Sequence, residues 1–199
     1  MNFLAHLHLS GADPELMAGN LMGDFVKGRL APDAYPPGIL RGLRLHRFID
    51  AAAGRNEWFN RSRYRLEAGF GLYRGVLVDL FYDHFLAKDW ASYSPVPLAE
   101  YLAESHRCLA AHREYLPERL ANILPTIFDD LIPSYTTVAG IERALFRMAR
   151  RIGRPDSPLI AGATALTAHY EGLHADFRSF LPELAAEIAA RRQEWDPVP

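Results

Sequence analysis

Hydrophobic residues recur at helical spacing along almost the whole chain of 199 residues. The stretch 75–90, GVLVDLFYDHFLAKDW, is apolar around its full circumference, which is typical of a helix buried on every side. Residues 3–9 are an exception, because their weak alternation of apolar and polar positions resembles a strand. Helices are predicted at residues 14–28, 37–53, 56–66, 69–91, 98–116 and 137–153, with one or two more over 164–195. We therefore predict an all-α protein in which residues 1–199 form a single domain, a helical bundle.

The predicted buried helix contains acidic residues that need an explanation. Asp79 and Asp83 are four residues apart and lie on one helix face, with His84 a step of about 100° further round. A second predicted helix carries an equivalent pair, His46 and Asp50, in the motif LHRFID. Because a carboxylate buried without a partner is costly, two such helices packed face to face would gather these side chains around one divalent ion.

A third acidic residue lies in the motif GNLMGDFVKG. Asp24 stands there between apolar residues, and glycines at positions 19, 23 and 28 would permit the close approach of another helix. Nitrogen and oxygen ligands without a thiolate suit manganese, iron, magnesium or zinc. An alternative remains open, in which the His–Asp pairs are ordinary hydrogen bonds and the buried acids pair with Arg44 or Arg47.

The composition is ordinary for a globular protein, with 49% hydrophobic and 23% charged residues. Cys108 is the single cysteine, so an intrachain disulfide and a cysteine-rich metal site are excluded. No apolar run approaches the roughly 18 residues that a membrane span requires. The first residues, MNFLAHLHLS, have neither a basic region nor a small-residue cleavage site, so we predict no signal peptide and a cytoplasmic protein.

Charge is distributed unevenly along the chain. Residues 25–65 contain nine basic and three acidic residues, a net charge of +6, whereas the whole chain carries −2. This segment, which includes Arg61 and Arg65, suggests an anionic partner, although a solvated arginine-rich surface would give the same count. Further arginines form a stripe between residues 143 and 154. This stripe is either a second contact with the partner or a solvated face.

Several motifs, in this order and at these separations, resemble the bacterial acyl carrier protein phosphodiesterases. They are MNFLAHLHL, GNLMGDFVKG, HRFID and VDLFYDHFLAKDW, together with HYEGLHADFRSFLP near the C-terminus. The resemblance implies a helical fold of the HD phosphohydrolase type and a manganese-dependent hydrolase, although other divalent metals would suit the ligands. Its implied activity removes 4′-phosphopantetheine from holo acyl carrier protein and leaves the apo form. The matching motif positions in this chain are His6, Asp24, His46, Asp50, Asp79, Asp83 and His84.

From these positions we assign expected roles. Carboxylates and imidazoles would hold the metal, and a second group would orient a ligand or move a proton. Where relatives often continue HRFID with a Thr-Asp pair, this chain has Ala53 and Gly54. The expected metal ligands are Asp24, His46, Asp79 and Asp83; the expected catalytic residues are Asp24, His46, Asp50, Asp83 and His84; and the expected substrate contacts are His6, Arg44 and Arg47.

Two other classes of function remain as alternatives. An HD-like enzyme acting on a nucleotide or another small phosphodiester would use the same metal cluster without a protein-sized basic surface. A helical protein that binds nucleic acid would use the basic surface but not the buried acids. No basic motif with interleaved aromatic residues is present, so we expect no nucleic-acid partner and rank this class last. The expected partner is the acidic holo acyl carrier protein, steered by the positive segment.

Overall fold

A computed structural model describes residues 1–31, 33–154 and 156–195, and side chains up to Arg192. The described residues form helices and no strands, which confirms the predicted all-α class. The α-helices are α1 (Phe3–Ser10), α2 (Pro14–Leu21), α3 (Pro37–Arg55), α4 (Glu57–Arg65), α5 (Tyr73–Lys88), α6 (Leu98–Ala111), α7 (Glu118–Thr126), α8 (Ile132–Ser134), α9 (Val138–Arg151), α10 (Gly162–Ala168) and α11 (Tyr170–Trp195). Shorter turns of 3₁₀ or π type are η1 (Gly23–Phe25), η2 (Ala68–Phe70), η3 (Trp90–Ser92), η4 (Arg113–Tyr115), η5 (Ile127–Leu131) and η6 (Pro158–Ala161).

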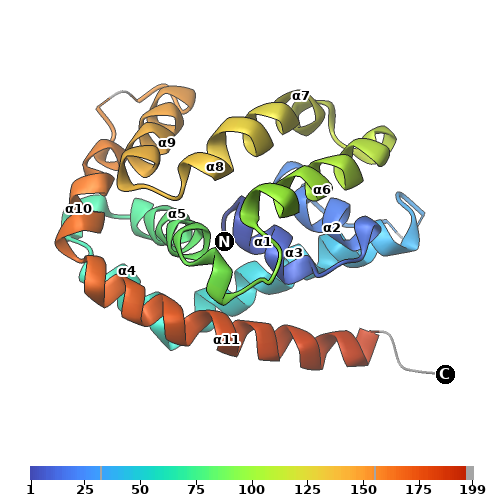
Figure 1. The fold of residues 1–199 in the computed structure, drawn as a ribbon, viewed down its shortest axis with the longest axis horizontal. Helices are drawn as coiled ribbons and strands as arrows, with labels where there is room; N and C mark the ends of the chain where they lie inside the picture. The colour runs from blue at the N-terminus through green and yellow to red at the C-terminus, as the bar shows by residue number, and fades with distance from the viewer. Residues whose placement is uncertain (32, 155, 196–199) are drawn as a thin grey trace.

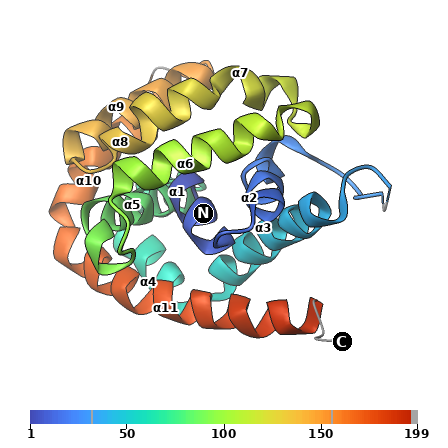
Figure 2. The same cartoon turned by 45° about the vertical axis from the view of Figure 1, so that its right-hand side comes forward.

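The helix α5 lies near the middle of the molecule. It packs against α1, α4, α9 and α11, and Figures 1 and 2 show α11 running along one side while α7, α8 and α9 follow the opposite side. The chain begins near the centre of these helices (Figure 1). The positions 80–87 of α5 are fully buried, as the pattern predicts, whereas Val76 and Asp79 keep some exposure on one stripe.

The weak alternation at residues 3–9 does not mark a strand, because these residues form α1. Both oxygens of the buried Asp83 carboxylate accept hydrogen bonds from the first turn of α1, from Leu4 N at 2.8 Å and Ala5 N at 2.9 Å. A carboxylate at this position satisfies backbone donors that have no partner inside the helix. The stabilising group comes from a distant part of the chain, so the local pattern could not reveal it.

Glycines allow α2 and α3 to cross in close contact. A Cβ atom at Gly19 would lie 2.1 Å from the carbonyl oxygen of Ile39, and one at Gly42 would lie 2.3 Å from the carbonyl oxygen of Leu16. The predicted close approach is therefore confirmed at position 19. Gly23 packs in the same way against a site residue, since its Cβ would lie 2.1 Å from Cγ of His46.

Arginines of the basic segment join α4 to α11. Asp176 of α11 is completely buried, and it pairs with Nε of Arg61 at 3.0 Å and Nε of Arg65 at 2.7 Å. Ser62 also donates a hydrogen bond to this carboxylate. The charges of Arg61 and Arg65 thus help to hold two helices together, although the side chain of Arg61 stays 54% exposed.

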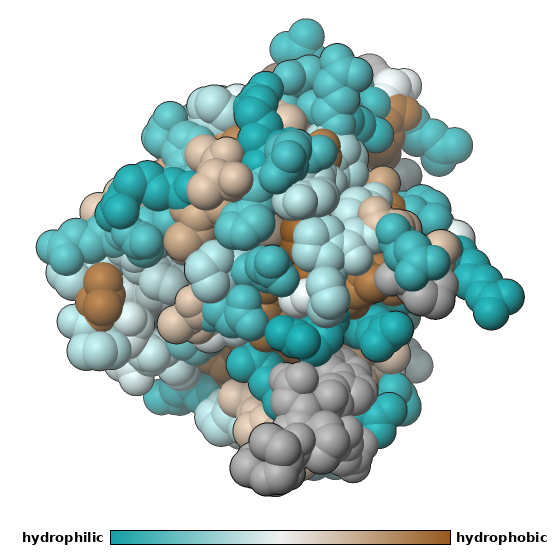
Figure 3. Space-filling view, turned by 90° about the vertical axis from the view of Figure 1, so that its right-hand side faces the viewer, coloured by the Kyte–Doolittle hydropathy of each residue, from teal (hydrophilic) through white to brown (hydrophobic). Residues whose placement is uncertain are grey.

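The surface seen in Figure 3 is mostly hydrophilic, and hydrophobic residues appear there in small, separated areas. Among the described residues, none of the helices combines the length and the apolar character needed to cross a membrane.

Candidate metal centre and adjoining cavity

Three side chains from α1 and α3 form a compact cluster of potential metal ligands. His6, His46 and Asp50 each offer a ligand atom, and these atoms lie within 4.8 Å of one another. The two imidazole rings are stacked, with centroids 4.1 Å apart and an angle of 14° between their planes. Both Nε2 atoms face the Asp50 carboxylate, His6 at 3.3 Å and His46 at 3.2 Å.

Asn20 of α2 determines how both rings are oriented. Its side-chain nitrogen donates to the carbonyl oxygen of His6 and to Oγ of Ser10, each at 2.8 Å, so its side-chain oxygen is left to accept from Nδ1 of His6 at 2.8 Å. The backbone oxygen of Asn20 accepts from Nδ1 of His46, also at 2.8 Å. When Nδ1 carries the only proton of a ring, the lone pair is on Nε2 and is directed at Asp50. This is the arrangement in which neutral histidines bind metals. His46 reaches this form by losing its Nε2 proton, because Asp24 and Asp50 outweigh burial and raise its pKa.

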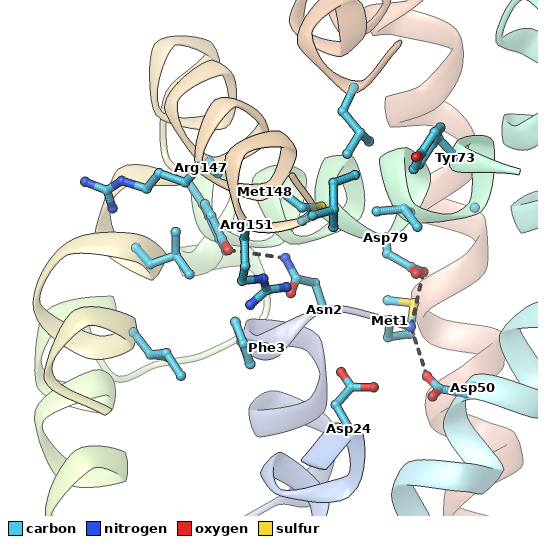
Figure 4. A pocket seen from close by; sticks show the side chains of 18 of the residues that line it. Met1, Asn2, Phe3, Asp24, Asp50, Tyr73, Asp79, Arg147, Met148 and Arg151 are labelled. Carbon is cyan, nitrogen blue, oxygen red and sulfur yellow. Dashed lines mark hydrogen bonds and ion pairs between the residues drawn. The ribbon is translucent and has the colours of Figure 1, made fainter. Parts of the chain in front are cut away.

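Two further carboxylates stand beside the cluster. Asp24 of η1 lies with Oδ1 3.7 Å from Nε2 of His46, and its side chain is 60% exposed. Asp79 of α5 lies on the other side, where the Met1 α-amino group bridges it to Asp50 at distances of 3.1 and 3.0 Å (Figure 4). The space between Asp50 and Asp79 thus accommodates a positive charge.

The electrostatics of the cluster follow from burial and this concentration of charge. Burial opposes the charged form of the Met1 amine, but the Asp79 and Asp50 carboxylates outweigh it and raise its pKa to about 10. Burial lowers the pKa of His6 to about 4. For His46 the effect of burial is overcome by Asp24 and Asp50, which raise its pKa to about 9.

The pKa values of the Asp50 and Asp79 carboxylates shift in opposite directions. Burial tends to raise the pKa of Asp50, but the neighbouring His46 and His6 imidazoles and the Met1 charge hold it well below its usual range. Burial raises the pKa of Asp79, which has fewer compensating partners.

These residues fit a divalent metal ion. Within the described part of the chain, the buried Nε2 atom of His6 has no hydrogen-bond partner and faces a carboxylate oxygen across 3.3 Å. Two electron-rich atoms in that arrangement are stabilised by a cation between them. Imidazole nitrogens and carboxylate oxygens without a thiolate are the donors that manganese, iron and zinc accept.

The structure does not bring every predicted site residue to this cluster. Asp83 was expected among the metal ligands, but both of its oxygens bind backbone N–H groups of α1. His84 was expected to act in catalysis, yet its Nδ1 donates to the carbonyl oxygen of Tyr135 at 2.7 Å and its Nε2 lies 2.9 Å from the hydroxyl of Tyr170. Asp79 and Asp83 share a helix face, but only Asp79 reaches the cavity.

Three expected substrate contacts also take different places. His6, expected to touch the substrate, is a member of the metal-ligand cluster. Arg47 is exposed and donates to the carbonyl oxygen of Gly28 at 2.7 Å. Arg44 is exposed on α3 and is absent from the described lining of the cavity.

A cavity of about 690 Å³ extends from the carboxylates to α7, η5 and α9. Asp24, Asp50 and Asp79 line one part of it, and Arg63, Arg147 and Arg151 also contribute. In Figure 4 the side chain of Arg151 points toward Asn2. The guanidinium of Arg147 points away from Asp24, Asp50 and Asp79 and pairs with Asp130. Apolar lining comes from residues such as Ile123, Ile127, Met148 and Leu159.

Sequence reasoning did not identify Asn20 or Arg151 as site residues. Asn20 lies inside the motif GNLMGDFVKG, so its position in a motif with Asp24 was an available signal. Arg151 belongs to the arginine stripe of α9, which the sequence left undecided between a contact and a solvated face.

Comparisons with known proteins agree with the motifs. A family model described as acyl carrier protein phosphodiesterase matches residues 1–184. Proteins named acyl carrier protein phosphodiesterase from Salmonella paratyphi A, Salmonella dublin and Salmonella agona are each 32% identical to this chain over 200 residues, covering 96% of it and 99% of each relative. The resemblance found in the sequence is thereby confirmed. No solved structure matches the chain, and its likeness to the HD phosphohydrolase fold stays a prediction.

Proposed function

This chain belongs to the acyl carrier protein phosphodiesterase family, and from that premise we propose that it removes 4′-phosphopantetheine from holo acyl carrier protein. The bond broken is the phosphodiester between the prosthetic group and a serine of the carrier, and the product is the apo carrier. One observation carries the proposal: the His6, His46 and Asp50 cluster lies beside a cavity lined by both carboxylates and arginines.

The cluster would hold a divalent ion, for which we propose manganese. His6, His46 and Asp50 would be its ligands, with Asp24 and Asp79 adjacent. When bound, such an ion neutralises phosphoryl oxygens and lowers the pKa of a bound water. In this proposal residues 1–199 are one metal-dependent phosphodiesterase domain, and Asp83 supports α1 instead of binding the metal.

Side chains around the cluster would divide the remaining tasks. Asn20 holds the two imidazoles so that each Nε2 faces the cluster. Asp24 is the carboxylate best placed to accept a proton from an attacking water at Oδ1, because it is exposed and also lines the cavity. Arg151 would contact the phosphate in place of Arg44 or Arg47, since a guanidinium matches the geometry of phosphate oxygens.

Mass spectrometry of holo acyl carrier protein tests this function. Incubation with the purified protein and Mn²⁺ should remove the mass of phosphopantetheine from the carrier, and a chelator should prevent the loss. His46→Ala should abolish the reaction. His8→Ala is the matched control, because His8 is on the same helix as His6 but packs beside Trp90. An unchanged carrier mass with folded, Mn²⁺-loaded protein would refute the proposal.

The small-substrate alternative is tested with the same preparation. Cleavage of nucleotides or of bis(4-nitrophenyl) phosphate without any cleavage of the holo carrier would replace the proposed substrate with a small phosphodiester. Circular dichroism of each variant separates loss of activity from loss of fold.

A further inference from the structure

We propose that one exposed face of α9 docks an acidic surface of the carrier protein. This face consists of Arg143, Phe146 and Arg150, and we call it the α9 stripe. The inference rests on the proposed function, because it identifies where the protein part of that substrate would bind.

The helix α9 presents two different faces. Ala144, Met148 and Arg151 follow one another at helical spacing and line the cavity. The α9 stripe is on the neighbouring, solvent-exposed side of the same helix. The docking surface and the cavity wall are therefore two sides of one helix.

The chemistry of the α9 stripe suits an acidic partner. The α9 stripe carries the positive charges of Arg143 and Arg150 and no acidic residue, in a chain whose total is −2. Residues 138–154 as a whole contain five arginines and one acidic residue, and one of these arginines, Arg147, pairs with Asp130. Phe146 is 50% exposed, and the guanidinium of Arg150 lies 5.9 Å from the centroid of its ring. Exposed aromatic and arginine side chains together are characteristic of protein-binding surfaces.

The basic segment 25–65 is less suited to this role than its charge suggests. Arg61 and Arg65 pair with the buried Asp176. Arg55 pairs with Glu187 of α11 at 3.1 Å. Among the basic residues of this segment, only Arg63 is in the described lining of the cavity. Asp176 and Glu187 of α11 thus compensate part of the positive charge counted in this segment.

The position of the scissile bond explains why docking must occur beside the cavity. The phosphate is attached directly to a serine of the carrier, so the carrier surface itself must approach the carboxylates. A docking face on α9 satisfies this requirement, because Arg151 and Asp24 line the same cavity. Charges at the rim of an interface steer encounter and fix orientation, which is the contribution expected of the α9 stripe.

Steady-state kinetics on two substrates tests the proposal. The substrates are the holo carrier and a short phosphopantetheinyl-serine peptide with the same scissile bond, measured with Mn²⁺ at low and high salt. The α9 variant is Arg143→Glu with Arg150→Glu. The comparison variant, Arg29→Glu with Arg44→Glu, makes the same change in charge on two exposed residues of the 25–65 segment.

At low salt the α9 variant should lose roughly tenfold or more in kcat/KM for the carrier, mainly through KM. The comparison variant should lose no more than about twofold, and neither should lose activity on the peptide. The loss should shrink at high salt, because exposed charges are screened. Phe146→Ala provides a variant without charge change, which should raise KM for the carrier but keep the salt dependence of the wild type.

Several results would overturn the inference. They are an equal loss in both charge variants, an unchanged α9 variant, or a parallel loss of peptide cleavage. Failure of the wild-type protein to cleave either substrate would instead refute the proposed function, and the inference with it. Wild-type cleavage of the carrier combined with an unaffected α9 variant would refute the docking face alone.

Discussion

Asn20 shows how a single buried residue can orient two candidate metal ligands at once. Its side chain and its backbone oxygen accept from the Nδ1 atoms of His6 and His46. Both rings therefore present Nε2 to the same carboxylate, and neither needs to rotate before binding. Interactions of this kind fix the tautomer of a ligand and raise its basicity.

Replacing this residue should weaken metal binding selectively. Asn20→Leu removes the acceptor for His6 and should lower Mn²⁺ affinity roughly 10–100-fold, as measured by calorimetric titration. Asn20→Asp keeps an oxygen acceptor at that position and should retain most of the affinity. Equal affinities for the wild type and the folded leucine variant would show that ring orientation does not matter here.

Asp83 and Asp79 should differ although they lie on the same face of α5. Asp83→Asn removes one acceptor from the first turn of α1, so the free energy of unfolding should fall by about 1–3 kcal/mol. Its Mn²⁺ affinity, measured on the folded protein, should change little. Asp79→Asn should show the reverse, with weaker metal binding and a smaller change in stability. A folded Asp83→Asn protein without metal binding would restore Asp83 as a ligand.

At the scale of elements, the crossing of α2 and α3 brings Asn20 and His46 together. Gly42→Ala would place a Cβ 2.3 Å from the carbonyl oxygen of Leu16, so the helices would have to separate. We expect a loss of about 1–3 kcal/mol in the free energy of unfolding from this overpacking, measured by urea denaturation.

Gly54 supplies a matched control in the same helix. A Cβ there meets no other atom within 4 Å. Gly54→Ala should therefore stabilise the protein by about 0.5–1 kcal/mol, because alanine loses less conformational entropy in a helix. Destabilisation of the same size in both variants would argue against a special close approach at Gly42.

The connection between α4 and α11 depends on a buried carboxylate. Arg61→Ala with Arg65→Ala leaves Asp176 without its two cations, which should cost about 3–5 kcal/mol of unfolding free energy. Arg55→Ala removes an exposed ion pair to the same helix and should cost no more than about 1 kcal/mol. Chemical denaturation measures the free energy of unfolding of both variants. A small effect of the double variant would show that the pairing with Asp176 contributes little to stability.

At the scale of the whole molecule, the metal cluster joins separate parts of the chain. His6, His46 and Asp50 come from α1 and α3, and Asp24 of η1 and Asp79 of α5 stand beside them, so an ion bound there would couple these elements. A ligand that binds only the folded state adds about 2.7 kcal/mol of stability at a concentration 100 times its Kd. Mn²⁺ should accordingly raise Tm, and a chelator should reverse the increase.

The same measurement identifies the site. His46→Ala should abolish the increase in Tm with Mn²⁺, whereas His8→Ala should retain it, because His8 lies outside the cluster. An increase of equal size in the His46 variant would place the metal elsewhere in the molecule.

The sequence by itself determined the features that depend on nearby residues. Helical periodicity, the start of α2 at Pro14 and the common face of His46 and Asp50 follow from backbone geometry over one or two turns. The motifs also identified the family, because each is a short contiguous segment and their order along the chain needs no knowledge of the fold. The acidic residues in the buried helix α5 also indicated polar partners around it, and Asp83 and Asp79 do meet N–H groups of α1 and the Met1 amine.

Only the tertiary structure decided what each side chain meets. Asp79 and Asp83 lie four residues apart on the same face of α5, yet one faces a cavity and the other the first turn of α1. Arg65 and Arg151 both lie in the last turn of an arginine-rich helix. However, Asp176 of α11 neutralises Arg65, whereas Arg151 lines the cavity. The reason is physical: spacing sets the direction in which a side chain points, whereas its partner is supplied by residues far along the chain through packing.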